Sequence, residues 1–422
     1  MSVRKREWYT ERQKRLIAEG QEPGEKQQAW IVDYSDQEGH RHIRTFDRKR
    51  DADAHAATIT VDVSKGVHTA PSKSVTVAAA ARAWLDGGTN WERATHDTYS
   101  QHVNLHILPY LGRHKLTQLT LPVVREFKDK LRLGAPAPGE ERGSPRSDAM
   151  ARKILITLGA ILSDAQERGH VAQNVVRSLS RRRRGKERQA ERRQKGKLQV
   201  GVDIPTPAEI KAIVTHAEGR WRPLFLTAIF TGLRASELRG LRWEDVDLKK
   251  GELHVRQRAD KYNAMGKPKS EAGERTVPLG PTVVSALREW KLQCPKGDGL
   301  VFPNGQGRVE NHSNIVHRGL APTLIRAGVK VSVKDAKGKP RRDEDGKPVV
   351  QPKYTGLHAF RHFYASWCIN RKADGGLELP PKTVQARLGH ASITITLDRY
   401  GHLFPRGDDG AELAAAEQAL LR

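Results

Sequence analysis

Apolar and polar residues alternate near the start of the chain in a way that is typical of short β-strands. Residues 30–34 and 42–46 each show this alternation, and the polar turn between them contains Gly39. Residues 3–8 fit a third strand, and the alanine-rich residues 51–63 fit a helix. The pattern therefore predicts a small sheet with one helix as the first domain, residues 1–65.

The spacing of apolar residues changes to three and four beyond a polar linker at residues 64–74, which predicts helices. The predicted helices cover residues 77–85, 95–108, 121–131 and 147–168, and the breaks between them fall at Pro109, Gly112 and residues 134–145. Together these segments predict an all-helical domain over residues 75–180.

The rest of the chain predicts a mainly helical domain with a small antiparallel sheet over residues 201–405. Its first helix should begin at Thr206, whose hydroxyl can cap the helix while Glu209 completes a capping box. Strands are predicted at residues 253–258 and 276–279, on either side of a polar hairpin at 260–274. An exposed β-excursion is predicted at residues 329–354, and a tail helix at residues 411–421 lies within a C-terminal tail, residues 406–422. The fold class is therefore α+β with several domains, since 422 residues exceed one ordinary hydrophobic core.

A strong excess of positive charge indicates the kind of partner. The chain has 74 Lys and Arg against 49 Asp and Glu, a net charge of +25 and a pI near 10.1. Such a field attracts polyanions, nucleic acid first and an anionic membrane second. Residues 1–10 lack an apolar leader and no long apolar span follows, so we expect a soluble, cytoplasmic protein. Cys294 and Cys368 stand outside any metal spacing, which fits a reducing compartment.

Two groups of basic residues are the candidates for DNA contact. The first lies on or beside the predicted strands and consists of Arg4, Lys5, Arg6, Arg41 and Arg44. A small sheet with projecting basic side chains can enter a major groove, although an ordinary exposed sheet face has the same pattern.

The second group is a run of ten basic residues against two acidic ones at positions 181–197, within a basic linker that we assign to residues 181–200. The run opens with Arg181, Arg182, Arg183 and Arg184. It is either a solvated connector or a segment that crosses the phosphate backbone and adds salt-dependent affinity.

Arg234 and Lys269 are the first candidates for chemistry. Arg234 follows an apolar segment and a glycine, so it should start the next helix, with Glu237 one turn on to orient it. An arginine there can fork onto two phosphate oxygens, whereas a plain surface Arg–Glu pair is the alternative. Lys269 lies on the predicted hairpin, from which it can donate a proton to a reacting oxygen, although most hairpin lysines face solvent.

His358, Arg361 and His362 share one face of a predicted helix. The two histidines have the spacing of zinc proteases, but Ala359 stands where those enzymes need a glutamate, and no third ligand is evident. A second phosphate clamp, with Arg361 beside an imidazole, is therefore a better interpretation than a metal site.

The last cluster, residues 388–400, contains His390 and, ten residues later, Tyr400. A free phenol has a pKa of about 10, so a tyrosine attacks at neutral pH only among positive donors and beside a base. Two arginines, a lysine, two histidines and this tyrosine meet that need. They describe a site that holds an anionic phosphate without a metal and forms a covalent bond to a side chain.

In this order the motifs resemble the tyrosine recombinase family, and the integrases of phages and integrative elements in particular, over residues 200–405. The motifs are Thr-Gly-Leu-Arg-x-Ser-Glu-Leu at 231–238, a lysine before Arg-Thr-Val-Pro-Leu at 275–279, His-x-x-Arg-His at 358–362, and Leu-Gly-His with a tyrosine ten residues later at 388–400. Lys269 is preferred to Lys267 as the hairpin lysine because its spacing to Arg275 matches the family hairpin.

The resemblance implies a role for each candidate residue. Tyr400 would form a 3′-phosphotyrosine, while Arg234 and Arg361 would grip the scissile phosphate. His358 would assist proton transfer, and Lys269 would protonate the departing 5′ oxygen. His390 would hydrogen-bond the phosphate, and Glu237 would support the site from behind.

The resemblance also implies the use of the other domains. Residues 75–180 are similar to a helical core-binding domain that closes a clamp around DNA, and residues 1–65 to an arm-type DNA-binding domain, which minimal dimer resolvases lack. Residues 393–396 are β-branched and alternate like a strand, but the resemblance places a helix there, capped by Ser392, and we adopt the helix.

The implied chemistry needs neither metal nor ATP. The implied partners are double-stranded DNA attachment sites, further copies of the chain in a synaptic homotetramer, and DNA-bending or excision-directionality proteins, all on the nucleoid. Three other functions stay open. They are dimer resolution or type IB topoisomerase-like relaxation by the same chemistry, DNA-binding regulation without catalysis, and zinc-dependent hydrolysis through His358 and His362.

Overall fold

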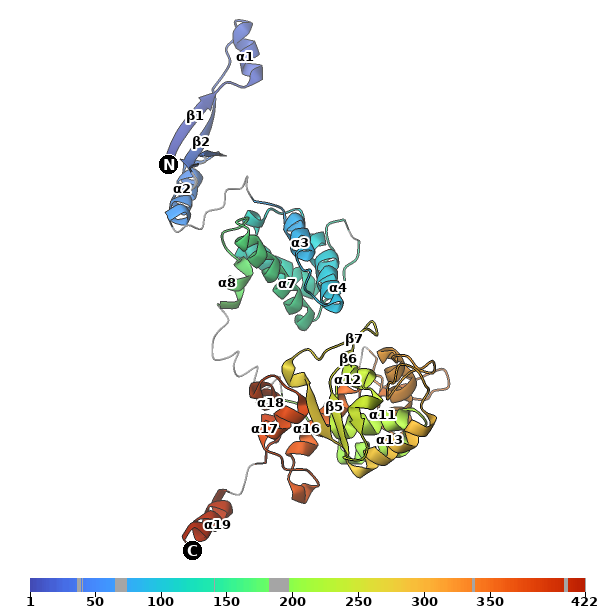
Figure 1. Ribbon diagram of the computed structural model, residues 1–422. Helices are drawn as coiled ribbons and strands as arrows, with labels where there is room; N and C mark the ends of the chain where they lie inside the picture. The colour runs from blue at the N-terminus through green and yellow to red at the C-terminus, as the bar shows by residue number, and fades with distance from the viewer. Residues whose placement is uncertain are drawn as a thin grey trace. The chain divides into compact units, whose positions relative to one another are not determined.

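The computed structural model describes residues 1–35, 39, 41–64, 74–139, 141–181, 197–335, 338–405 and 409–421. The chain divides into two compact units, Met1–Lys186 and Glu187–Arg422, which are described separately. Helices and small antiparallel sheets build both units, which confirms the α+β class (Figure 1). None of the helices within the described ranges is long and apolar enough to cross a membrane.

The chain begins with the predicted antiparallel sheet, whose strand order is β1–β2–β3. Its strands are Ser2–Trp8, Gln27–Ser35 and Arg41–Phe46. Helix α2, Lys49–Ser64, packs on one face of the sheet, and the core between them consists of Val32, Tyr34, Ala52, Ala56 and Ile59. The sheet-plus-helix prediction is confirmed, while the predicted linker falls almost wholly on residues 65–73, outside the described residues.

The sequence pattern does not predict helix α1, Glu11–Ala18, which lies between β1 and β2. Thr10 and Gln13 form a capping box at its start, yet none of its side chains is buried. The helix therefore lacks the apolar stripe on which a prediction from periodicity depends.

Helices alone build the second part of the first unit, as predicted. They are α3 Val77–Asp86, α4 Arg93–His102, α5 Leu108–Leu111, α6 Leu121–Leu133, α7 Asp148–Glu167 and α8 Val175–Arg181, with a π-helical turn at Val103–Ile107 and a 3₁₀ turn at Leu116–Gln118. Their shared core includes Ile107, Phe127, Leu158 and Ile161.

The predicted break at Pro109 is wrong. The π-helical turn Val103–Ile107 precedes it, and the helix continues as α5 through Leu111. Pro109 occupies the first turn of α5, where a missing backbone N–H leaves no hydrogen bond unmade. The chain therefore turns only after Leu111.

The second unit is mainly helical, as predicted, and its core surrounds the apolar helix α11, Trp221–Thr231. The other helices are α10 Pro207–His216, α12 Ala235–Gly240, α13 Pro281–Gln293, α14 His312–Asn314, α15 Ala321–Arg326, α16 His358–Ile369, α17 Pro381–Leu388, α18 Ile393–Tyr400 and α19 Asp409–Leu421, with a π-helical turn at Ile315–Leu320 and 3₁₀ turns at Trp243–Asp245, Glu271–Gly273, Lys372–Asp374 and Gly401–Leu403. The capping box of Thr206 and Glu209 starts α10 as expected.

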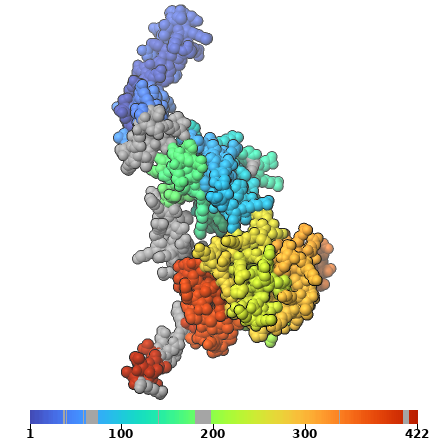
Figure 2. Space-filling model, in the orientation of Figure 1, coloured from blue at the N-terminus to red at the C-terminus, as the bar shows by residue number. Residues whose placement is uncertain are grey.

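A three-stranded antiparallel sheet of order β4–β5–β8 crosses this unit. Its strands are Val246–Asp247, Glu252–Val255 and Arg275–Pro278. The single strand predicted at residues 253–258 is wrong, because β5 ends at Val255 and the chain then pairs Arg258–Ala259, β6, with Met265–Gly266, β7. Helix α17 packs against β8, and Figure 2 shows the red-orange surface of the α16–α18 region beside the yellow-green surface of the α11–β8 region.

The predicted β-excursion is present in the described part of residues 329–354. Strands β9, Lys330–Ser332, and β10, Val350–Pro352, pair antiparallel at its base. Isolated bridges Lys334↔Pro340 and Arg342↔Pro348 pair the middle of the excursion with each of its two arms. At its exit, Lys353 and Tyr354 both bond to the Glu209 carboxylate, at 2.5 and 2.9 Å, which ties the excursion to the start of α10.

Residues 393–400 form helix α18, which confirms the helix over the strand. The Ser392 hydroxyl accepts the N–H of Thr394 at 3.2 Å and caps the helix. Thr396 and Tyr400, four residues apart, are buried, whereas Ile395 is 42% exposed. Burial at this spacing follows a helical face and opposes the strand-like alternation of the sequence.

Candidate active site

Arg234 and Glu237 form the first side of the site at the start of α12. Gly232 ends α11 in the left-handed conformation, φ 63°, and a Cβ there would lie 2.4 Å from the ring of Tyr364. Arg234 is the N-cap of α12, and its backbone N–H donates to Glu237 Oε2 at 2.9 Å. Its guanidinium donates to Glu237 Oε1 at 2.6 Å while its side chain stays 38% exposed. Glu237 therefore orients Arg234 with one face open to a ligand, as predicted.

Three arginines converge on the carbonyl end of α17. Arg275 Nε donates to the carbonyl of Arg387 at 2.8 Å, Arg361 Nη2 to that of Leu388 at 2.5 Å, and Arg234 Nη2 to that of Gly389 at 3.0 Å. The last carbonyls of a helix lack partners within the helix and carry the negative end of its dipole, so they suit these cations. The end of α17 thus assembles segments that lie far apart in the sequence.

Gly389 is the residue that lets the chain turn at this point. It caps α17 in the left-handed conformation, φ 63°. A Cβ at this position would lie 2.8 Å from both the Ala272 carbonyl oxygen and Arg275 Nη1. A side chain here would therefore push the hairpin away from the end of the helix.

Arg361 is almost fully enclosed. It is 2% exposed, and besides the Leu388 carbonyl it donates to the carbonyl of Gly232 at 2.7 Å. Burial, and next the nearby Arg234, lower the pKa of Arg361 to about 9, so it stays charged at neutral pH. Arg361 therefore joins α11, α16 and α17 and adds positive charge beside Arg234.

Arg275 is a site residue whose role the sequence reasoning missed, because it served there only to set the spacing of the hairpin lysine. Its side chain is 6% exposed and its Nη2 donates to Glu237 Oε2 at 2.9 Å. Burial raises the pKa of Glu237, but Arg275 and Arg234 outweigh burial, and the net pKa is lowered. Arg275 thus keeps charged the carboxylate that orients Arg234.

His390, which precedes α18, lies close to Tyr400, the last residue of that helix. His390 Nδ1 lies 2.9 Å from the hydroxyl of Thr396, and its ring is parallel to that of Tyr400 with 6.4 Å between centroids. Burial, and next Arg361, lower the pKa of His390 to about 3, so it is neutral at pH 7. Tyr400 is 1% exposed, and burial raises its pKa.

His362 is a second residue that the candidate set missed. Its Nδ1 lies 2.8 Å from the hydroxyl of Tyr400, and its ring meets that of His358 edge-on at 4.5 Å. A contact between residues 38 positions apart has no local sequence signal. The zinc alternative needs a third ligand beside these two histidines, and the described residues contain no group of three His, Cys, Asp or Glu side chains placed to hold a metal.

Lys269 lies in the loop between β7 and the 3₁₀ turn Glu271–Gly273, and its side chain is exposed. The competing Lys267 is held through its backbone, because its carbonyl accepts from Arg258 Nε at 3.1 Å. The structure therefore places both lysines on the exposed hairpin, outside the buried group of Arg361, His390 and Tyr400.

The basic residues of the first sheet divide between its two faces. The register pairs Arg4 with Ile31, Arg6 with Ala29 and Arg41 with Ser35, on the face away from α2. Arg44 pairs with Val32, on the face that α2 covers, so the four arginines do not form one surface. Arg4 and Arg41 also both pair with Asp33.

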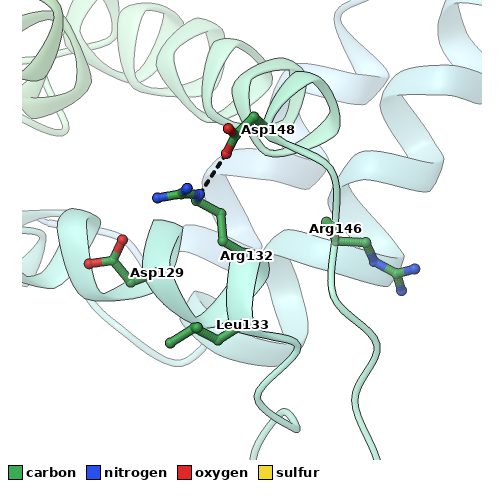
Figure 3. A pocket seen from close by; sticks show the side chains of 5 residues that line it. All are labelled: Asp129, Arg132, Leu133, Arg146 and Asp148. Atoms are coloured by element: carbon green, nitrogen blue, oxygen red, sulfur yellow. Dashed lines mark ion pairs between the residues drawn. The ribbon is translucent and has the colours of Figure 1, made fainter. Parts of the chain in front are cut away.

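Of the basic run, Arg181 is the last residue of α8, while Arg182, Arg183 and Arg184 lie outside the described residues. The first unit also holds an open pocket of about 400 Å³ lined by Asp129, Arg132, Leu133, Arg146 and Asp148 (Figure 3). An ion pair of 2.6 Å between Arg132 and Asp148 crosses its wall.

Comparison with known proteins gives matches to one kind of protein. Residues 205–406 match the model of the phage integrase family. A tyrosine recombinase XerC-like protein of Caldanaerobacter subterraneus is 30% identical over 236 residues, which cover 50% of this chain and 53% of the relative. The prophage integrase IntR of Escherichia coli is 29% identical over 215 residues, 49% of each chain. The chain thus spans about half the length of these curated relatives.

Two solved structures share the fold. The Tn1549 transposon integrase in complex with transposon right end DNA has a TM-score of 0.58 at 18% identity, over 82% of this chain and 99% of that chain. A lambda integrase tetramer bound to a Holliday junction has a TM-score of 0.51 at 17% identity, over 87% of this chain and 94% of that one.

Proposed function

We propose that the protein is a site-specific tyrosine recombinase that integrates or excises a mobile DNA element, since residues 205–406 match the model of the phage integrase family. The observation that carries this proposal is the convergence of Arg234, Arg361, His390 and Tyr400, from three separate segments, around the end of α17. Two guanidiniums beside a tyrosine suit a phosphodiester that is attacked by a hydroxyl.

In the proposed reaction the Tyr400 oxygen attacks the scissile phosphorus and the bond to the 5′ oxygen breaks. Arg234 and Arg361 offset the charge that builds on the non-bridging oxygens, with His390 as a further donor and Glu237 behind Arg234. Lys269 protonates the leaving 5′ oxygen, and His358 assists proton transfer. Because the 3′-phosphotyrosine keeps the energy of the broken bond, a 5′ hydroxyl can reverse the step without ATP.

The proposed substrate is double-stranded DNA at paired attachment sites. The net charge of +25 and the DNA-bound state of the Tn1549 and lambda integrases support it. We assign arm-site binding to residues 1–65, core-site binding to residues 75–180 with the linker 181–200, and catalysis to residues 201–405. The proposed assembly is a homotetramer on the paired sites, which the lambda integrase tetramer supports. DNA-bending or directionality proteins would take part, and the reaction would occur on the nucleoid.

Covalent capture tests this function. Nicked duplexes tiled across the DNA that flanks the gene are incubated with the protein, and adducts that survive denaturing detergent are isolated and sequenced. We expect the wild-type protein to form an adduct on a small set of tiles and Tyr400→Phe to form none, since phenylalanine lacks the attacking oxygen. An undiminished adduct with Tyr400→Phe would overturn the role of Tyr400. Failure of the wild-type protein on every tile would overturn the function.

Dimer resolution by the same chemistry is a second candidate, because the relative from Caldanaerobacter is XerC-like. The β1–β3 sheet with α2 favours the integrase, since minimal resolvases of the family lack an arm domain. The captured sites decide between them: recombination that requires two different sequences supports integration, and recombination between two identical sites supports resolution.

A further inference from the structure

His362 has no part in the reaction proposed above, yet it holds the group that reacts. Its Nδ1 is 2.8 Å from the Tyr400 hydroxyl, and the two side chains are 7% and 1% exposed. Burial of an imidazole is costly unless its nitrogens are bonded, so this contact is a defined feature of the fold.

The other two imidazoles of the site are placed differently. His390 Nδ1 is engaged with the Thr396 hydroxyl, and its ring lies parallel to that of Tyr400. His358 contacts the ring of His362 edge-on. Within the described part of the chain, the Tyr400 hydroxyl thus makes its hydrogen bond to His362 and to neither of the other two histidines.

His362 is in the protonation state that a base needs. Burial, and next His358, lower the pKa of His362 to about 4, so at pH 7 the ring is neutral and Nδ1 can offer a lone pair. The charged and titratable groups that face it are His358 and Arg361 on α16, Arg399 on α18, and Asp203 ahead of α10. A bound phosphodiester would offset these cations and make the imidazole more basic at the moment of attack.

We propose that His362 accepts the proton of the Tyr400 hydroxyl as this oxygen attacks the DNA phosphate, an inference that rests on the proposed function. The Tyr400 oxygen forms its bond to phosphorus, the proton passes to His362 Nδ1, and the 5′ oxygen leaves and takes a proton from Lys269. In the reverse step the 5′ hydroxyl attacks and returns its proton to Lys269, and the departing Tyr400 oxygen recovers its proton from His362. Atoms and charges balance in both directions without a further reagent.

Two substitutions separate a base from a mere support of the tyrosine. In His362→Asn the amide oxygen occupies the place of Nδ1 and accepts the hydrogen bond, but it cannot take up a proton. His362→Phe removes both properties. Single-turnover cleavage is measured on the captured site, and DNA affinity and thermal midpoint are measured alongside. We expect both variants to bind DNA normally and to cleave about 100-fold or more slowly, the usual contribution of a positioned base.

The pH profile and a sulfur-containing substrate give readouts that a supporting role would not move. For His362→Asn the cleavage rate should rise about tenfold per pH unit above neutrality, as hydroxide replaces the base, while the wild-type rate stays nearly flat. A bridging 5′ sulfur needs no proton to leave, because thiols are far more acidic than alcohols. It should therefore rescue Lys269→Ala and leave His362→Asn slow.

His254→Asn is the matched control, since His254 Nδ1 also bonds a hydroxyl, that of Thr276 at 2.9 Å, on the β5–β8 sheet. It should cleave within about twofold of wild type. Near-normal cleavage by His362→Asn together with slow cleavage by His362→Phe would show that His362 only positions Tyr400, and would overturn the proposal. Cleavage faster than wild type by either variant would also overturn it. A wild-type protein that forms no adduct would refute the proposed function instead.

Discussion

Single arginine side chains decide how this site is assembled. Arg275, Arg361 and Arg234 donate to three successive carbonyls at the end of α17. Each arginine is also tied to a second segment: Arg275 and Arg234 to Glu237, and Arg361 to Gly232. Because buried cations without partners are costly, each of these residues constrains the position of the others. The orientation of the partly exposed Arg234 is thus set by buried residues behind it.

Arg275 should matter more for stability than any surface ion pair. Arg275→Ala leaves the Glu237 carboxylate, 3% exposed, with one of its two arginines, so we expect a loss of about 3 kcal/mol in the free energy of unfolding. Arg326→Ala removes an exposed pair with Glu218 at 3.7 Å and should cost under about 1 kcal/mol. Urea unfolding of both variants measures the difference, and equal costs would contradict this role of Arg275.

The same pair predicts the pH dependence of stability. The pKa of Glu237 is lowered in the folded protein. Its stabilising contribution is therefore fully present above the unfolded-state pKa and is lost as pH falls through the lower folded-state pKa. Acid should destabilise the wild-type protein more steeply than Arg275→Ala, because the variant has already lost much of this contribution.

At the scale of elements, α18 combines a weak helical sequence with little burial. Ile393, Thr394, Ile395 and Thr396 are β-branched, and only Thr396 and Tyr400 of this helix are buried. Helix α16, in contrast, has ten buried residues in twelve. The element that carries the proposed nucleophile thus buries only two side chains, one of which, Tyr400, contacts His362. This suits the hypothesis that the segment moves Tyr400 into and out of the site.

Amide hydrogen exchange tests this mobility. We expect the amides of α18 to exchange at least about tenfold faster than those of α16, because opening α18 exposes far less apolar surface. Exchange is followed by mass spectrometry on peptides that cover residues 358–369 and 393–402 of the free protein. Equal protection of the two helices would show that α18 is fixed as firmly as the core.

At the scale of the whole molecule, net charge should govern the proposed interaction with DNA. A net charge of +25 predicts affinity that falls steeply with salt, because each neutralised phosphate releases counterions. The open face of the first sheet and the basic run both offer arginines, but Arg4 and Arg41 already share Asp33. The basic run is therefore the stronger candidate for backbone contacts.

Replacement of Arg181, Arg182, Arg183 and Arg184 by glutamine measures that contribution. If all four contact phosphates, the slope of log affinity against log salt should fall by about 3 to 4, at about 0.9 per contact. Salt titrations of DNA binding by wild type, by this variant and by Arg4→Gln with Arg6→Gln give the comparison. An unchanged slope would mean that the run is a solvated connector.

The sequence by itself determined those features that depend on neighbours along the chain. The cap at Thr206, the helical spacing of residues 77–168 and the alternation of the first sheet each involve residues a few positions apart. The four motifs also supported the resemblance to the tyrosine recombinases, since each is a short string of side chains. Helix α1 was not predicted, although Thr10 and Gln13 form a capping box, because none of its side chains is buried and the helix lacks an apolar stripe.

Tertiary structure alone decided which residues meet. His362 reaches Tyr400 across 38 positions, and Arg275 reaches a carbonyl 112 positions away. The acceptors at the end of α17 are backbone carbonyls, which every residue possesses, so no residue type marks them in the sequence. They become binding sites for arginine only because α17 ends at Gly389 and the fold brings three guanidiniums to that end.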